Sequence, residues 1–314
     1  MEIRADTVKF YFDRHIWSKL INMPDNERGN FEALIKPLKD QSRICIYYSP
    51  TGILEMVQGV FIEEHYEMCR EELKLASRVT NERFLDNPWD HVRRTAYAFL
   101  GVPFKEPDLS FLNLLKEIIV LPYIQMRPKI DSIRKLAQWE ENWADSLTEI
   151  KSRLRKEFGL EQTDGTDRSN AEKFRSNRGI IFRIQRYWPY FCQHFSLPEE
   201  FNNLSLDKAI NQFHSFRYWI NYRITYENKM LFENKKPMSS DYLDWEQVVY
   251  LNIMDYLVTE DNKLITIFKE SKDGGELNRA WMHFSHFVSS LKGALPPKRA
   301  PDTTYEKWYP ARKP

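Results

Sequence analysis

The run Tyr256-Leu257-Val258-Thr259 is short and β-prone, and it lies among residues with helical periodicity near the carboxyl end of the chain. Such a strand is not stable alone, because its backbone groups and its apolar face both need partners. Two other runs of this kind occur near the amino end, Val8-Lys9-Phe10-Tyr11-Phe12 and Ile44-Cys45-Ile46-Tyr47-Tyr48. The sequence therefore predicts that all three strands join one sheet.

Helical periodicity surrounds these runs and indicates the fold class. Residues 15–20 and 31–40 separate the first two strands, and a helix that Thr51 can cap follows the second strand. Alternation of strand and helix favours a parallel sheet with helices on its faces. Near the third strand, helical spacing covers residues 241–254, 261–268 and 277–291. We therefore expect an α/β fold with a small parallel sheet and flanking helices.

The middle of the chain, from about Phe61 to Pro237, has helical periodicity only. Its candidate helices cover residues 61–76, 89–99, 111–119, 130–158, 171–192 and 206–231. Because the three strands belong to one sheet, this segment would interrupt the sheet domain as a large all-α insertion. The expected boundaries are 1–60 and 239–292 for the two halves of the sheet domain, 61–238 for the insertion, and 293–314 for an extended C-terminal tail rich in proline and basic residues.

The composition is that of a folded, aromatic-rich protein without a strong overall charge. Of 314 residues, 42% are hydrophobic, 29% are charged and 14% are aromatic, and the formal net charge is +1. A polyanion would therefore have to bind at a local patch. The three cysteines are isolated and give no zinc or disulfide framework. No signal peptide or long apolar run is evident, so we expect a cytoplasmic protein with no membrane partner.

Four acidic residues stand at the ends of the expected elements. Asp13 and Asp261 follow the first and third strands, Glu55 lies one turn into the helix after the second strand, and Asp244 starts the helix before the third. Ligands of parallel α/β sheets bind beyond the carboxyl ends of the strands, so these side chains can converge there. Carboxylates bind Mg²⁺ and Mn²⁺, which activate water for phosphodiester hydrolysis. Taken singly, each acid is equally well explained as a helix cap.

Three segments resemble, in the same order, the signature segments of PIN-domain nucleases. They are Tyr11-Phe12-Asp13-Arg14-His15-Ile16-Trp17-Ser18, Ser49-Pro50-Thr51-Gly52-Ile53-Leu54-Glu55-Met56, and the stretch from Asp244 to Leu264 that contains Thr259-Glu260-Asp261. The resemblance implies a PIN-like sheet and an Mg²⁺- or Mn²⁺-dependent ribonuclease, the activity of many bacterial toxins. It also implies that the catalytic residues and metal ligands are Asp13, Glu55, Asp244 and Asp261, with Thr259 in support.

Two features depart from the family pattern. His15 occupies a position where the family often has Asn or Ser, a change that could alter the metal geometry, and no final strand is evident after Phe268. Asp241 and Asp255 are alternatives for the third ligand. Because Asp255 comes just before the third strand, we expect it to end a helix or to face solvent.

Arginines interleaved with aromatic residues form two candidate nucleic-acid patches in the helical middle. Arginine pairs with phosphates while bases stack on aromatic rings. The predicted substrate contacts are Arg175, Arg178, Arg183, Arg186, Arg217 and Arg223. The alternative is that the arginine stems cover an aromatic core and pair with neighbouring glutamates.

These observations predict a metal-dependent endonuclease that hydrolyses RNA to leave a 5′-phosphate and a 3′-hydroxyl, in a bacterial toxin or defence role. One alternative is a catalytically inactive PIN-like protein-interaction module. Another is a nuclease directed at DNA, because attack by water on phosphorus does not use the 2′-hydroxyl. A homodimer, an inhibitory protein partner, and the choice between one and two metal ions stay open.

Overall fold

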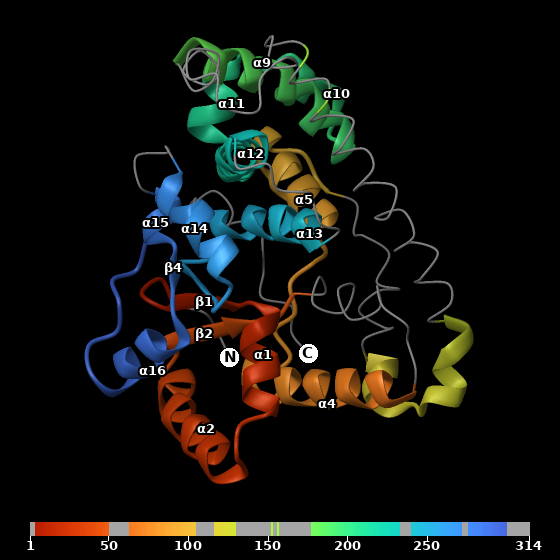
Figure 1. The fold of residues 1–314 in the computed structure, drawn as a ribbon, viewed down its shortest axis with the longest axis vertical. Coiled ribbons are helices and arrows are strands. Elements are labelled where there is room, and N and C mark those ends of the chain that lie inside the picture. The colour runs from red at the N-terminus through yellow and green to blue at the C-terminus, as the bar shows by residue number, and fades with distance from the viewer. Residues whose placement is uncertain are drawn as a thin grey trace.

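The computed structural model describes residues 4–49, 63–104, 116–129, 152, 156, 177–232, 240–271 and 276–299. Within these ranges a four-stranded parallel sheet lies between two layers of helices (Figure 1). The prediction of an α/β fold with a small parallel sheet and flanking helices is confirmed. The expected helix that contains Glu55, most of 111–119 and nearly all of 130–158 fall outside the described residues.

The sheet has the strand order β2-β1-β3-β4. Its strands are β1 (Val8–Phe12), β2 (Ile44–Tyr47), β3 (Tyr256–Val258) and β4 (Trp281–Met282). Phe10 of β1 is level with Ile46 of β2 on one side and with Tyr256 of β3 on the other. The strand near residue 257 thus joins the two strands from the amino end, as its isolation in the sequence predicted.

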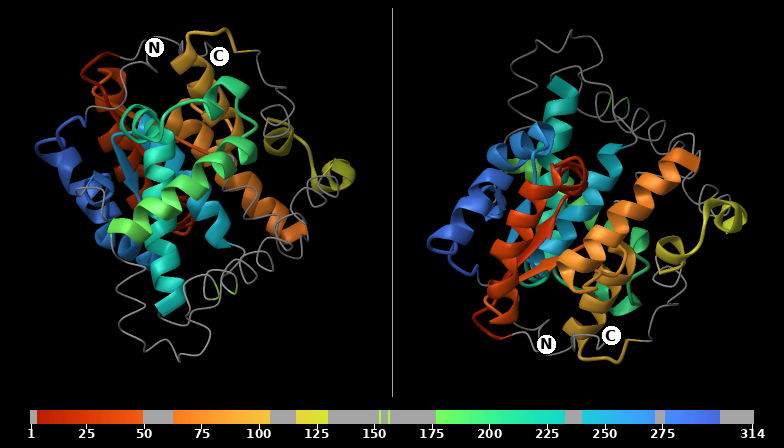
Figure 2. Two further views of the ribbon diagram at one scale, coloured as in Figure 1. Left: turned by 90° about the horizontal axis from the view of Figure 1, so that it is seen from above. Right: turned by 90° about the horizontal axis from the view of Figure 1, so that it is seen from below.

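Both faces of the sheet are buried, as a parallel sheet requires. Alternate residues of β1 point to opposite faces, so that Phe10 and Phe12 belong to one hydrophobic core and Tyr11 to the other. Figures 1 and 2 show helices on both sides of the sheet. The first core is covered by α1 (Arg14–Ile21), α2 (Asp25–Asp40), α4 (Glu63–Thr80) and α16 (Phe284–Lys292). The second is covered by α5 (Pro88–Leu100), α9 (Asn177–His194), α12 (His214–Phe232) and α14 (Asn262–Glu270).

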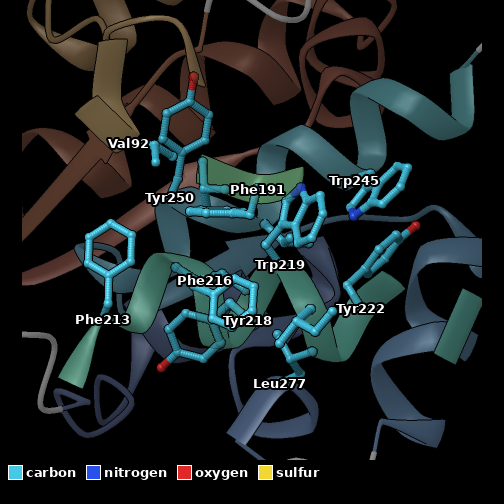
Figure 3. Packing of buried hydrophobic residues seen from close by; sticks show 14 of the residues in the cluster. Val92, Phe191, Phe213, Phe216, Tyr218, Trp219, Tyr222, Trp245, Tyr250 and Leu277 are labelled. Carbon is cyan, nitrogen blue, oxygen red and sulfur yellow. The ribbon is translucent and has the colours of Figure 1, made fainter. Parts of the chain in front are cut away.

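The second core is built mainly from aromatic side chains of the helical middle. The ring centroid of Phe191, on α9, lies 5.0 Å from those of Phe216 and Trp219 on α12 (Figure 3). Aromatic pairs at this spacing add to the energy of apolar burial. The predicted helix over 206–231 is in fact two helices, α11 (Leu206–Gln212) and α12, separated at the buried Phe213. A short helix, α10 (Glu199–Asn202), precedes them.

Two of the predicted helices near the carboxyl end are wrong in extent. The region 241–254 forms α13 (Ser240–Gln247) and then a 3₁₀ helix, η1 (Val248–Asn252). The region 277–291 is divided into α15 (Glu276–Arg279), β4 and α16. β4 is the final strand that was not evident in the sequence. It forms because Ala280 and Met282 supply the carbonyl groups that accept hydrogen bonds from the β3 side, at 2.7 and 3.1 Å.

The tail is described as far as Arg299, and residues 294–299 contain no helix or strand. They run along the amino end of the sheet, where the hydroxyl of Tyr256 donates to the Pro297 carbonyl at 2.7 Å. Arg299 donates to the Asp255 carbonyl at 3.2 Å and to the Tyr218 hydroxyl at 3.1 Å. None of the helices in the described ranges combines the length and the apolar character needed to cross a membrane.

Candidate carboxylate site at the carboxyl edge of the sheet

Asp13 is the first residue beyond β1, and its side chain is only 3% exposed. Its backbone N–H donates to the Val258 carbonyl at 3.0 Å, so pairing with β3 holds it beside the end of that strand. The carboxylate caps α1, because Oδ1 accepts from the Arg14 N–H at 2.7 Å. Oδ2 lies 3.2 Å from Nδ1 of His15. His15, the residue that departs from the family pattern, therefore contacts Asp13, the first predicted ligand, directly.

Thr259 connects Asp13 to Asp261. Its buried hydroxyl donates to Asp13 Oδ2 at 2.7 Å and accepts from the Asp261 N–H at 3.0 Å. Asp261 caps α14, because its Oδ1 accepts from the N–H groups of Lys263 and Leu264 at 2.7 and 3.0 Å. Both capping bonds use Oδ1, so the second oxygen of Asp261 takes no part in the cap. Thr259, predicted to support the acids, is thus hydrogen-bonded to two of them.

Asp244 lies inside α13 and does not start this helix, so capping does not explain it. It is 9% exposed, and its helix packs against α12, which carries Tyr222. Burial raises the pKa of the Tyr222 phenol well above its ordinary value, and the negative charges of Asp244, Asp261 and Asp13 raise it further. Electrostatic effects of this kind weaken with distance. The negative charges of three of the four predicted acids therefore all raise the pKa of one buried phenol, although these acids come from the two ends of the chain.

Glu72, on α4, is a further acid near Asp13 that the sequence interpretation missed. It is 3% exposed, and burial raises its pKa to about 8; the Arg14 charge opposes this shift, while the charge of Asp13 adds to it. Its Oε1 has no hydrogen-bond partner among the described residues. One signal was available, since Glu72 interrupts the buried helical spacing of Cys69, Leu73 and Ala76.

Of the two alternatives for the third ligand, Asp241 and Asp255, the structure describes the side chain of Asp255 only. Asp255 lies before β3, at the opposite edge of the sheet from Asp13. It is 0% exposed and accepts from the Lys9 N–H at 2.8 Å, so the expectation that it faces solvent is wrong. Burial raises its pKa to about 6, although the Lys9 hydrogen bond and nearby basic groups oppose this shift. The side chain of Asp241 is outside the described residues, as is the whole of Glu55.

The donors at this edge are carboxylate and hydroxyl oxygens, the ligand types that Mg²⁺ and Mn²⁺ prefer. In the described parts of the chain, no group of three or more His, Cys, Asp or Glu side chains is arranged to hold a metal ion. The predicted ligand Glu55 lies outside those parts. The donor types suit a hard divalent cation, whereas the described side chains include no group of three arranged to bind one.

The arginines predicted to contact substrate have several different surroundings. Arg183 and Arg223 are each 1% exposed, and both pair with the buried Glu227, at 3.7 and 3.0 Å. These two guanidinium groups are therefore enclosed in the protein interior. Arg217 is partly exposed and pairs with Glu276 at 2.8 Å. Arg186 is exposed, whereas Arg175 and the side chain of Arg178 are outside the described residues.

Arg223 lies in a cage of aromatic rings that includes Trp245, the residue after Asp244. The centre of its guanidinium group is 3.8 Å from the ring centroid of Trp245 and 4.1 Å from that of Tyr187. Trp245 also stacks on Trp219, with ring centroids 5.0 Å apart (Figure 3). Cation–π contacts of a desolvated guanidinium are among the stronger interactions of this kind. They fix the residue that follows Asp244, and so fix α13 against α12.

Comparison of this chain with protein-family models, with curated proteins and with solved structures gave no match. The resemblance to PIN-domain nucleases therefore rests on the three segments of the sequence. The geometry of Asp13, Thr259, Asp244 and Asp261 is independent of that resemblance.

Proposed function

We propose that this chain is a metal-dependent endonuclease with a PIN-like sheet, and that it hydrolyses phosphodiester bonds in RNA. The observation that supports this proposal is the hydrogen-bonded set of Asp13, Thr259 and Asp261 at the carboxyl edge of a parallel sheet. Like charges in a poorly solvated place are unfavourable unless a cation or a proton compensates for them. Glu55 would complete the ligand set.

The residues at this edge would each have a defined task. Asp13, Asp244 and Asp261 would hold Mg²⁺ or Mn²⁺, and the bound ion would lower the pKa of the attacking water and neutralise the charge that develops on the phosphate. Thr259 would hold Asp13 through the hydrogen bond of 2.7 Å and keep its carboxylate in one orientation. Arg186, exposed on α9, is the described member of the first arginine patch that would contact the RNA backbone.

The competing function is that of a catalytically inactive interaction module. It is favoured by one observation, which is that Asp13 and Asp261 both have a complete structural role as helix caps. A nuclease directed at DNA would use the same acids, and it differs from the proposal only in its substrate.

Asp244 is the best residue for the deciding experiment, because it is not a cap. We expect Mn²⁺ or Mg²⁺ to support cleavage of labelled RNA by the wild type and to raise its melting temperature, with about 2.7 kcal/mol of added stability when Mn²⁺ is at 100 times its Kd. Asp244→Asn should lose both effects. Asp207→Asn, an exposed acid at the start of α11, is the matched control and should retain them.

The outcomes separate the three functions. Cleavage of RNA in preference to a DNA of the same sequence supports the proposal, and the reverse preference supports the DNA-directed nuclease. If the wild type shows neither cleavage nor any change of melting temperature with either cation, the interaction module is the correct function.

A further inference from the structure

His283 is the first residue beyond β4, at the same edge of the sheet as Asp13 and Asp261. The N–H of Thr259 donates to the carbonyl of Met282 at 3.1 Å, so the pairing of β3 with β4 places His283 beside the end of β3. Neighbouring strands are about 4.8 Å apart, so the ends of β1 and β4, with β3 between them, are separated by about 10 Å. His283 therefore adjoins the carboxylate site from the side of β4.

Glu260 holds the imidazole ring of His283 by one nitrogen. Nδ1 of His283 lies 3.2 Å from Oε2 of Glu260, the residue that follows Thr259 at the end of β3. The other oxygen of Glu260, Oε1, accepts from the Phe284 N–H at 3.1 Å and from Nζ of Lys19, on α1, at 3.4 Å. An imidazole whose Nδ1–H donates to a carboxylate is fixed in orientation and exchanges protons with a substrate through Nε2.

Structural roles account for Glu260 but not for His283. The backbone of His283 stands immediately before α16, yet its side chain makes no capping hydrogen bond to that helix, and Glu260 supplies the cap instead. The His283 side chain is 44% exposed, and exposed ion pairs contribute only about 0–1 kcal/mol to stability. A half-exposed ring that a carboxylate orients is the arrangement of a general acid or base.

The charged groups around His283 come from three elements. Glu260 contacts the ring from the end of β3, and Lys19 of α1 lies on the far oxygen of that carboxylate. Helices α1 and α16 cover the same face of the sheet (Figure 1). The third group is Lys269 of α14, which lies 5.4 Å from the centroid of Trp281, the ring that makes an edge contact with His283. Only the protonated ring forms an ion pair with Glu260, and in this form Nε2 carries the proton that a general acid must give.

We propose that His283 is a further catalytic residue at this edge, the general acid that protonates the leaving oxygen when a phosphodiester bond is hydrolysed. The oxygen of the attacking water forms a bond to phosphorus, and the water gives one proton to solvent. The bond from phosphorus to the 3′-oxygen breaks, and that oxygen keeps the electron pair and takes the proton from Nε2. The ring then regains a proton from solvent.

The layout of the edge suits this division of labour. In-line displacement places the attacking and leaving oxygens on opposite sides of phosphorus. The acids beyond β1 and β3 would lie on the side of the attacking water, and His283 beyond β4 on the side of the leaving oxygen. Glu260 is a positioning residue in this scheme. The inference rests on the proposed function, because it needs phosphodiester hydrolysis at this edge of the sheet.

The test compares two RNA substrates that differ in one atom. One has the natural 3′-oxygen at a single scissile linkage, and the other has sulfur there, which leaves as a thiolate and needs no proton. His283→Gln should lower kcat for the oxygen-bridged RNA about 100- to 10,000-fold, the usual contribution of a general acid, and should change kcat for the sulfur-bridged RNA less than about 3-fold. His286→Gln, an exposed histidine of the same helix, is the matched control and should leave both rates unchanged.

The results distinguish this inference from the function on which it rests. If His283→Gln slows the two substrates equally, or slows neither, the role of His283 is wrong and the nuclease stands. If the wild type cleaves neither RNA with Mn²⁺ or Mg²⁺ present, the proposed function is overturned and the inference falls with it. Loss of the oxygen-bridged activity alone, in a variant that melts like the wild type, supports the inference.

Discussion

The hydroxyl of Thr259 donates to Oδ2 of Asp13 across 2.7 Å, although the two residues are 246 positions apart in the sequence. The same oxygen of Thr259 accepts from the Asp261 N–H at 3.0 Å. One hydroxyl therefore sets the orientation of the first predicted acid and the backbone of the last. It also satisfies two polar groups at an edge where water has little access.

Replacing Thr259 by Val should destabilise the protein by about 1–3 kcal/mol. Valine has the same shape but leaves Asp13 without its donor and the Asp261 N–H without its acceptor. Thr259→Ser retains the hydroxyl and should cost clearly less. Urea unfolding followed by circular dichroism measures both variants. Equal losses for Val and Ser would mean that the methyl group of Thr259, and not its hydroxyl, carries the stability.

Two substitutions of Asp261 separate its capping role from its charge. Asp261→Asn retains an acceptor for the N–H groups of Lys263 and Leu264, so the stability without cation should be close to that of the wild type. Asp261→Ala removes the cap and should cost about 0.5–2 kcal/mol. Both variants should lose the Mn²⁺-dependent rise in melting temperature. If Asp261→Asn retains that rise, Asp261 is a cap and not a ligand.

Of the ion pairs in the helical middle, the buried pair of Arg223 and Glu227 should cost the most stability when it is broken. Glu227→Gln removes the carboxylate partner of both Arg183 and Arg223, each 1% exposed, and such losses cost about 3–5 kcal/mol. Glu32→Gln, which breaks the exposed pair with Arg78, should cost about 0–1 kcal/mol. Chemical denaturation of both variants checks the contrast. Similar losses would mean that the aromatic cage stabilises Arg223 without its partner.

His91 should make the fold sensitive to acid. Burial lowers its pKa from 6.5 to about 4, while Asn252 lies within hydrogen-bond distance of its Nε2 at 2.8 Å. The folded state thus prefers the neutral ring, so this contribution is complete above pH 6.5 and is lost as the pH falls toward 4. The loss should approach about 1.4 kcal/mol per pH unit.

The variant His91→Gln checks this pH dependence, because it removes the ionisable ring. Its free energy of unfolding should fall less steeply than that of the wild type between pH 6.5 and pH 4. His286→Gln, at an exposed position of α16, is the control and should follow the wild type. Parallel curves for the wild type and His91→Gln would show that other groups control the acid sensitivity.

The sequence was sufficient for those elements that have a strong local pattern. β1, β2 and β3 were predicted because apolar β-prone runs stand between helical segments, and their pairing was predicted because β3 had no other partner. β4 was missed because its two residues, Trp281 and Met282, are too few to show a strand pattern. The split of 206–231 was missed because Phe213 continues the helical spacing of Ala209 and Phe216, so that only tertiary packing reveals the break.

The site was predictable to a similar degree. Asp13, Thr259 and Asp261 follow strands directly, so their approach could be argued from parallel topology. Glu72 and Tyr222 come from helices whose rotation about their own axes is set by packing, which no local pattern contains. The sequence likewise could not predict that Arg183 and Arg223 are buried. An arginine beside aromatic residues in the sequence occurs equally well in a surface patch and in a buried aromatic cage.

Because β1 pairs with β3, which lies far along the chain, the sheet can form fully only after β3 has been synthesised. A chain leaves the ribosome from its amino end, so β1 and Asp13 emerge long before the residues that adjoin them. Until residues 256–261 emerge, β1 lacks its central neighbour, and Asp13 lacks both the carbonyl of Val258 and the hydroxyl of Thr259. Nascent chains that stop short of this segment carry the first acid but cannot assemble the site. Whatever this edge of the sheet does is therefore postponed until residues 256–261 have been synthesised.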